Sequence, residues 1–447
     1  MRTDLRLALL LTRGSDRREW WRVTLTAVGA GLATGFMLAA AAIASLRGQF
    51  SVSIGNGLLD RPGERSGIVL ALLLLLVPVL GFLGQCARIG AVHRDRRLAG
   101  LRLAGASPAQ VRRIAALETG LACLAGAAVT TVFSVLLVLG EWRNPPALAW
   151  AGFAGIAVAV PLLGALVSAL ALRRVVASPL GWVRRVRPSR GRGPGAAFLG
   201  AALVILVVGL FTAPVTFGGF DTAPALVFGV VILTGVGAVW VTGATARLTG
   251  RRLAARTGNP ATLIAAERLR DDPWAAARTH AAVLLVTVVG TGFTGIRQVL
   301  LDILHARGPE MMAWDMSFYT TGVNLTGAAI LVALMITLSG LAVGTAESLA
   351  ARRRGLAAQA AAGVPHAVLG RALLLETALP LAPAVALAGA GGMAISTWYA
   401  WLADGGAAVP VLPLLIPVAV YAACLLAAAT SLPLLRRSVH PTELRFT

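Results

Sequence analysis

A chain of 447 residues that is 57% hydrophobic and 13% charged falls outside the class of soluble globular proteins, in which about 25% of residues are charged. Its net charge of +21 comes from arginine alone, because the sequence contains no lysine. The arginines gather in alternate segments between apolar runs, a pattern that sets membrane orientation and attracts anionic lipids, and that argues against a nucleic-acid site. We therefore predict an all-α membrane protein.

About ten apolar segments are long enough to cross roughly 30 Å of hydrocarbon as helices. In chain order they are 23–45, 67–91, 115–139, 149–173, 196–213, 223–246, 281–303, 322–346, 370–397 and 411–432. With the amino terminus inside, 34 of the 40 arginines fall in cytoplasmic segments. This asymmetry predicts that both termini are cytoplasmic.

A short amphipathic stretch at 259–280 precedes the seventh of these helices. Asn259 is suited to an N-cap, and Pro260 to the first helical position. Two interpretations stay open: a helix that lies in the headgroup plane, or an ordinary arginine-flanked helix start.

An internal repeat relates the two ends of the chain. A shift of 258 residues places 94–121 on 352–379, with LET matching LET near the end of each segment. An even number of spans separates equivalent helices, so the repeats share one orientation. We predict two parallel four-helix repeats, 1–174 and 259–447, joined by an arginine-rich loop and a two-helix linker at 175–258.

The loop between the second and third helix of each repeat is the most informative segment. Each of two glycines precedes a proline at an expected helix start: Gly105 lies three residues before Pro108, and Gly363 lies two residues before Pro365. Such a glycine is expected to break the spanning helix and begin a new, short helix at the membrane surface. Val111 and Leu369 are expected on the apolar side of that helix.

Thirteen residues beyond each glycine stands an acid, Glu118 or Glu376, just inside the next span. A carboxylate at this depth is costly unless it is paired, and the nearby arginines are its natural partners. The three cysteines, in or beside apolar runs, are predicted to be small buried residues. The sequence predicts no metal site and no catalytic residue, and a phosphate-binding loop of the G-x-x-x-x-G-K-[ST] type is impossible without lysine.

The doubled pattern of a basic cluster, L-x-x-x-G-A-S-x-x-Q-V-x-R and a following L-E resembles the FtsX-like permease domain of ABC transporters, which MacB, LolC/E and BceB-type permeases share. The ending SLPLLRRSVHPTELRFT also resembles that family's usual carboxyl terminus. The resemblance implies that the loops dock on an ATPase subunit. The implied coupling residues are Gly105, Ser107, Pro108, Val111 and Arg113, and Gly363, Pro365, Leu369 and Arg371.

The resemblance further implies a permease subunit, not itself an enzyme, in a bacterial cytoplasmic membrane. A separate cytosolic ABC ATPase homodimer would bind ATP and Mg and drive export or extraction of an amphipathic peptide, lipid or antibiotic. The ten-helix layout is similar to BceB, but the loops at 46–66 and 304–321 are too short for that family's extracytoplasmic domains. The alternative is an FtsX-like signalling protein that controls a cell-wall hydrolase or sensor kinase without transport. An ion-coupled carrier is less favoured, because the clearest acids lie near the cytoplasmic ends of their helices. No substrate-binding residue follows from the pattern.

Overall fold

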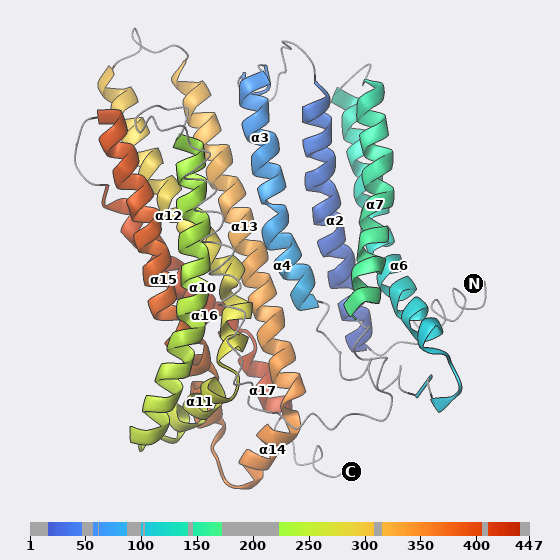
Figure 1. The fold of residues 1–447 in the computed structure, drawn as a ribbon, viewed down its shortest axis with the longest axis vertical. Coiled ribbons are helices and arrows are strands. Elements are labelled where there is room, and N and C mark those ends of the chain that lie inside the picture. The colour runs from blue at the N-terminus through green and yellow to red at the C-terminus, as the bar shows by residue number, and fades with distance from the viewer. Residues whose placement is uncertain are drawn as a thin grey trace. The chain divides into compact units, whose positions relative to one another are not determined.

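The computed structural model describes residues 17–46, 57–60, 62–86, 100–101, 103–141, 146–171, 223–307, 315–404 and 410–438. Within these ranges the regular secondary structure is helical, with no β-strand. The chain divides into two compact units, Met1–Arg187 and Pro188–Thr447. Figure 1 shows the long helices of each unit.

The first unit is organised around α2, which contacts every other described helix of that unit. Its helices are α2 (Arg17–Ser45), α3 (Pro62–Leu74), α4 (Leu76–Cys86), α6 (Pro108–Glu141) and α7 (Ala147–Ala171). Proline explains the break between α3 and α4. Pro78 has no N–H to offer the carbonyl of Leu74, four residues earlier, and α3 ends at that residue.

The most extensive contact in the first unit joins α2 to α6, and it depends on residues without a side chain. A Cβ on Gly31 would lie 2.9 Å from the Thr130 hydroxyl, and one on Gly35 3.3 Å from the same side chain. On the facing helix, a Cβ on Gly126 would collide with the backbone carbonyl of Ala27. These contacts bring the two backbones together, as small residues do in membrane helix pairs.

The described residues of the second unit form nine helical elements. They are α10 (Ala223–Arg256), α11 (Pro260–Asp271), α12 (Pro273–Arg307), α13 (Met316–Ala351), α14 (Arg353–Ala361), α15 (His366–Asp404), η2 (Leu412–Leu414), α16 (Leu415–Ala429) and α17 (Leu432–Ser438). The most extensive contact again joins two long helices, α12 and α15. Helix α10, which the sequence assigns to a linker, packs along α11, α12 and α15.

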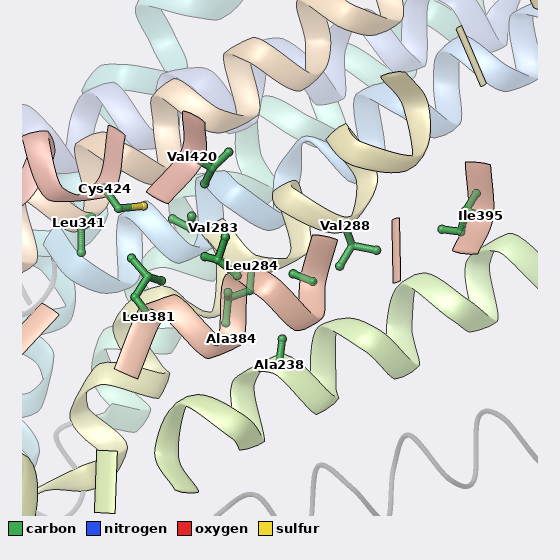
Figure 2. Packing of buried hydrophobic residues seen from close by; sticks show 12 residues of the cluster. Ala238, Val283, Leu284, Val288, Leu341, Leu381, Ala384, Ile395, Val420 and Cys424 are labelled. Atoms are coloured by element: carbon green, nitrogen blue, oxygen red, sulfur yellow. The ribbon is translucent and has the colours of Figure 1, made fainter. Parts of the chain in front are cut away.

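The core of the second unit is aliphatic and contains many small side chains. Figure 2 shows Ala238 of α10 facing the α12 and α15 residues Leu284 and Ala384, with Val420 and Cys424 of α16 nearby. Each of these five side chains is at most 3% exposed. Cys86 and Cys123 in the first unit are also buried free thiols, so the prediction for the cysteines is confirmed.

Helix α11 begins as predicted. Asn259 is the N-cap, and its side-chain oxygen accepts a hydrogen bond from the backbone N–H of Ala261 at 3.0 Å, with Pro260 in the first turn. Much of the apolar side of this helix is covered by the chain itself. Its buried residues, which include Ala265 and Leu269, lie on a helix that packs against α10 and α15.

Nine helices in the described ranges are long and apolar enough to cross a membrane. Their large apolar side chains point outward. Phe133 and Leu136 of α6 are 62% and 64% exposed, and Leu162 and Val167 of α7 are 63% and 64% exposed. Such a surface requires an apolar solvent. The chain is a multi-pass membrane protein.

The nine helices coincide with nine of the ten predicted spans, and the tenth, 196–213, lies outside the described residues. The predicted bounds are too narrow. Helix α6 begins seven residues before the predicted 115, and α15 four residues before 370. Hydropathy marks the apolar centre of a helix, whereas the hydrogen-bonded helix continues beyond the hydrocarbon.

Candidate coupling site

Both repeated loops turn at a glycine in the left-handed region. Gly105 has φ 94° and Gly363 has φ 89°, values that residues with a Cβ rarely adopt. A Cβ on either residue would meet nothing within 4 Å. Glycine is therefore required here by the backbone conformation and not by crowding.

The hydrogen bonds that close the two turns also correspond. In the first unit, Ala106 donates its N–H to the carbonyl of Leu101 at 2.9 Å. In the second unit, 258 residues later, Val364 donates to Gln359 at 3.1 Å. A bond spanning six residues around a left-handed glycine is the Schellman closure of a helix carboxyl terminus. The helix before each turn is thus stopped in the same way.

The helix that follows each turn differs from the prediction of a short surface helix. Helix α6 runs for 34 residues and α15 for 39 residues, each without interruption into the membrane. At 1.5 Å per residue α6 is about 51 Å long, and the hydrocarbon is about 30 Å thick. In the second unit the short helix is α14, of nine residues, which lies before the glycine.

Val111 and Leu369, expected on the apolar side of the helix, have side chains that are buried within the chain. Val111 is 0% exposed and packs with Ala115, Leu101 and Ala106. Leu369 is 1% exposed and belongs to a leucine cluster of the second unit. Each secures its turn against the following helix.

The remaining predicted coupling residues whose side chains are described lie at the surface. They are Gly105, Ser107 and Arg113 in the first unit and Gly363, Pro365 and Arg371 in the second. Pro108 begins α6. The sequence interpretation missed Leu103, which is 78% exposed one residue before the Ala-Gly of the first turn. A leucine next to a helix stop in a basic loop was the available signal.

A capping box secures the start of α6. The Ser107 hydroxyl accepts the backbone N–H of Gln110 at 3.2 Å, and the Gln110 side-chain oxygen accepts the N–H of Ser107 at 2.8 Å. This reciprocal pair satisfies two donors that a helix start leaves unpaired. The second loop has Pro365 at the position of Ser107, and proline has neither a side-chain acceptor for the first bond nor an N–H to donate in the second.

Glu118 is paired as expected, by an arginine from a different span. It is 3% exposed and forms an ion pair with Arg22 of α2, which is 5% exposed. Among the described residues, the Arg22 guanidinium donates its hydrogen bond to the carboxylate of Glu118. The pair joins the first and third spans of the unit near the turn.

Glu376 is also paired, but with different elements. Arg352, between α13 and α14, lies 2.8 Å from its Oε1, and Arg268 of α11 lies 3.3 Å from its Oε2. The Glu376 side chain is 19% exposed and the two arginines are 38% and 16% exposed. This network is closer to solvent than the pair in the first unit.

The position that corresponds to Arg22, 258 residues on, is His280, the eighth residue of α12. His280 is 3% exposed, and its Nδ1 lies 2.7 Å from the carbonyl of Ala276. Its Nε2 is buried without a hydrogen-bond partner among the described residues. A buried histidine thus stands where the first unit has an arginine.

Beneath the second turn, leucines from four helices form one cluster. They are Leu349 of α13, Leu356 of α14, Leu369 and Leu373 of α15, and Leu435 of α17. Ile264 of α11 and Val364 of the turn pack against them. Helix α14 and the turn are thereby fixed to the ends of α11, α13, α15 and α17.

No model of a known protein family matches the chain, and no curated protein matches it.

Proposed function

We propose that this protein is the permease subunit of an ABC transporter, built from two parallel four-helix FtsX-like repeats. In this proposal its two glycine turns bind a separate cytosolic ATPase, a homodimer that holds ATP and Mg. ATP hydrolysis then drives export or extraction of an amphipathic substrate across the bacterial cytoplasmic membrane.

The observation that carries the proposal is the matched pair of turns. Gly105 and Gly363 share a left-handed conformation, the same closing hydrogen bond and an exposed position, 258 residues apart. A symmetric partner with two equivalent surfaces needs two equivalent contact points on one chain. Two turns of one shape meet that requirement.

The helices that follow the turns are suited to transmit movement. Both α6 and α15 continue without a break from the exposed turn into the membrane. In the second unit, the cluster around Leu356 and Leu369 fixes α14 to α15. Because packed elements move as bodies and deform little, a displacement of either turn would be carried along its helix.

The absence of lysine from the whole sequence supports a separate ATPase. A phosphate-binding loop needs a lysine to reach the β- and γ-phosphates, so this chain has no loop of that type. On this proposal, the protein acquires ATPase activity only by assembly.

The test separates docking from folding with two substitutions eight residues apart. Leu103→Asp alters a side chain that is 78% exposed, whereas Val111→Asp places a charge at a side chain that is 0% exposed. When co-expressed with a candidate ABC ATPase, the Leu103→Asp protein should retain its thermal stability and lose about tenfold or more in ATPase affinity, equal to about 1.4 kcal/mol. Val111→Asp should lose stability itself. Leu103→Met, which keeps the apolar contact, is the control.

ATPase binding by Leu103→Asp that equals binding by the parent protein would remove Leu103 from the interface. If the same result held for Ala361→Asp, at the corresponding position of the second turn, the proposal would be wrong. Reconstitution of the complex in liposomes then distinguishes transport from signalling. ATP-dependent substrate movement supports a transporter, and ATP-dependent control of a hydrolase or kinase without movement supports the transmission alternative.

A further inference from the structure

One side of α10 carries a continuous stripe from apolar to basic residues. Leu233, Trp240, Arg247 and Arg251 follow at intervals of seven, seven and four residues, which places them on one side of a helix. Leu233 and Trp240 are 40% and 43% exposed, and both arginines are exposed. Leu248, beside the arginines, is 46% exposed.

The spacing along the helix matches the depth of one membrane leaflet. At 1.5 Å per residue, Trp240 lies about 10 Å from Arg247, and Leu233 lies about 10 Å further on. The hydrocarbon of one leaflet is about 15 Å thick. With Arg247 at the headgroups, Trp240 therefore lies against the acyl chains of the same leaflet, and Leu233 lies near the bilayer centre.

The rest of α10 holds this stripe in a fixed orientation. A Cβ on Gly243 would lie 2.5 Å from the ring of Trp274, and one on Gly250 would lie 2.9 Å from the carbonyl oxygen of Ala266 in α11. These contacts join α10 closely to α11 and α12. The arginine-bearing turns are therefore held from an adjoining side of the helix, which fixes the direction in which the arginines project.

The positive charge of the stripe is not neutralised within the described part of the chain. Neither Arg247 nor Arg251 pairs with a described acidic side chain, and Glu267 on the adjacent α11 pairs with Arg270. Arginine forms bidentate hydrogen bonds to phosphate, and a tryptophan at the interface contacts both chain and headgroup.

We propose that an anionic phospholipid binds along this stripe, with its phosphate at Arg247 and Arg251 and an acyl chain on Trp240 and Leu233. A lipid fits better than an acidic protein, because basic and apolar residues form one surface that extends deep into the membrane-spanning part of α10. The site is independent of the proposed transporter function.

Native mass spectrometry of the purified protein tests this site with an equimolar mixture of phosphatidylglycerol and phosphatidylcholine. The parent protein should retain phosphatidylglycerol preferentially. The double variant Arg247→Gln/Arg251→Gln should lose about 30-fold of that preference, or about 2 kcal/mol at 1.4 kcal/mol per factor of ten. Arg247→Lys/Arg251→Lys should keep most of it, since the charge remains.

Arg256→Gln is the matched control, because it removes the same charge from the same helix about 13 Å beyond Arg247. It should retain lipid like the parent protein. Glycerol phosphate should not displace the lipid, and Trp240→Ala should weaken retention, since the acyl contact contributes. Equal loss in Arg256→Gln, equal retention of the two lipids, or displacement by glycerol phosphate would overturn the proposal. Unchanged lipid retention in the double variant would also overturn the proposal, and it would do so even if that variant no longer bound a soluble acidic protein.

Discussion

Glu118→Gln should destabilise the protein severely, although it removes only a charge. The carboxylate is 3% exposed and pairs with Arg22, which is 5% exposed. The substitution would leave the guanidinium buried without its counter-charge. Removing one partner of a buried ion pair costs about 3–5 kcal/mol. The free energy of unfolding should fall by that amount.

Glu376→Gln, 258 residues on, should cost much less. Its partner Arg352 is 38% exposed, so water can solvate the cation that remains. Arg268 is less exposed, at 16%, so leaving its charge without a counter-charge would still cost some free energy. Partly exposed pairs contribute about 0–1 kcal/mol each, which gives about 0–2 kcal/mol for the two pairs of this network. Two acids at corresponding positions should therefore differ in their effect on stability by about 1 kcal/mol or more.

Denaturant titration in detergent micelles measures both losses, with membrane insertion checked beforehand. The decisive control replaces both members of the first pair, as in Arg22→Met/Glu118→Leu. An apolar pair of similar volume removes both desolvation costs, so stability should return to near that of the parent. Equal losses for Glu118→Gln and Glu376→Gln, or a double variant no more stable than Glu118→Gln, would refute the distinction between a buried clamp and a solvated network.

Three further substitutions test the turn and the helix crossing in the same assay. Gly105→Ala should lower the free energy of unfolding by about 1–2 kcal/mol, because Gly105 has a positive φ. Gly100→Ala, in a helix with open space around it, should not destabilise the protein. Equal effects of the two substitutions would contradict the conformational argument. Gly126→Ala should weaken the α2–α6 contact, and Gly140→Ala, where a Cβ meets nothing within 4 Å, should be tolerated; tolerance at both sites would show that the two helices can separate. Ser107→Ala should cost about 1 kcal/mol through loss of the capping box, and a neutral result would mean that water replaces its bonds.

The number and position of most spans were predictable because hydropathy reports the apolar centre of each helix directly. The turns were predictable for a different reason. A glycine that recurs after 258 residues before a proline-containing helix start indicates a backbone requirement, and both Gly105 and Gly363 have positive φ. The arginine partners of Glu118 and Glu376 were expected as a class, since an acid at that depth needs a cation.

The direction in which individual side chains point was not predictable. Val111 lies on the apolar side of its helix, as expected, but that side faces the chain's own turn. Periodicity identifies an apolar face and does not identify what covers it. For the same reason α11 could be assigned an amphipathic pattern but not its packing against α10 and α15. The pairing of Glu118 with Arg22 joins residues 96 positions apart and has no local signature.

The two turns reach one backbone shape through different supporting contacts. The first is followed by a capping box at Ser107 and a buried pair at Glu118, and the second by Pro365 and a leucine cluster that includes Leu356. Side-chain hydrogen bonds therefore add to a small apolar contact at the first turn, whereas the second turn depends on a larger apolar cluster. Apolar burial weakens on cooling, whereas a capping box has no such strong temperature dependence. The second turn should consequently exchange its amide hydrogens relatively faster at low temperature, and hydrogen exchange of Val364 and Ala106 at two temperatures measures that difference.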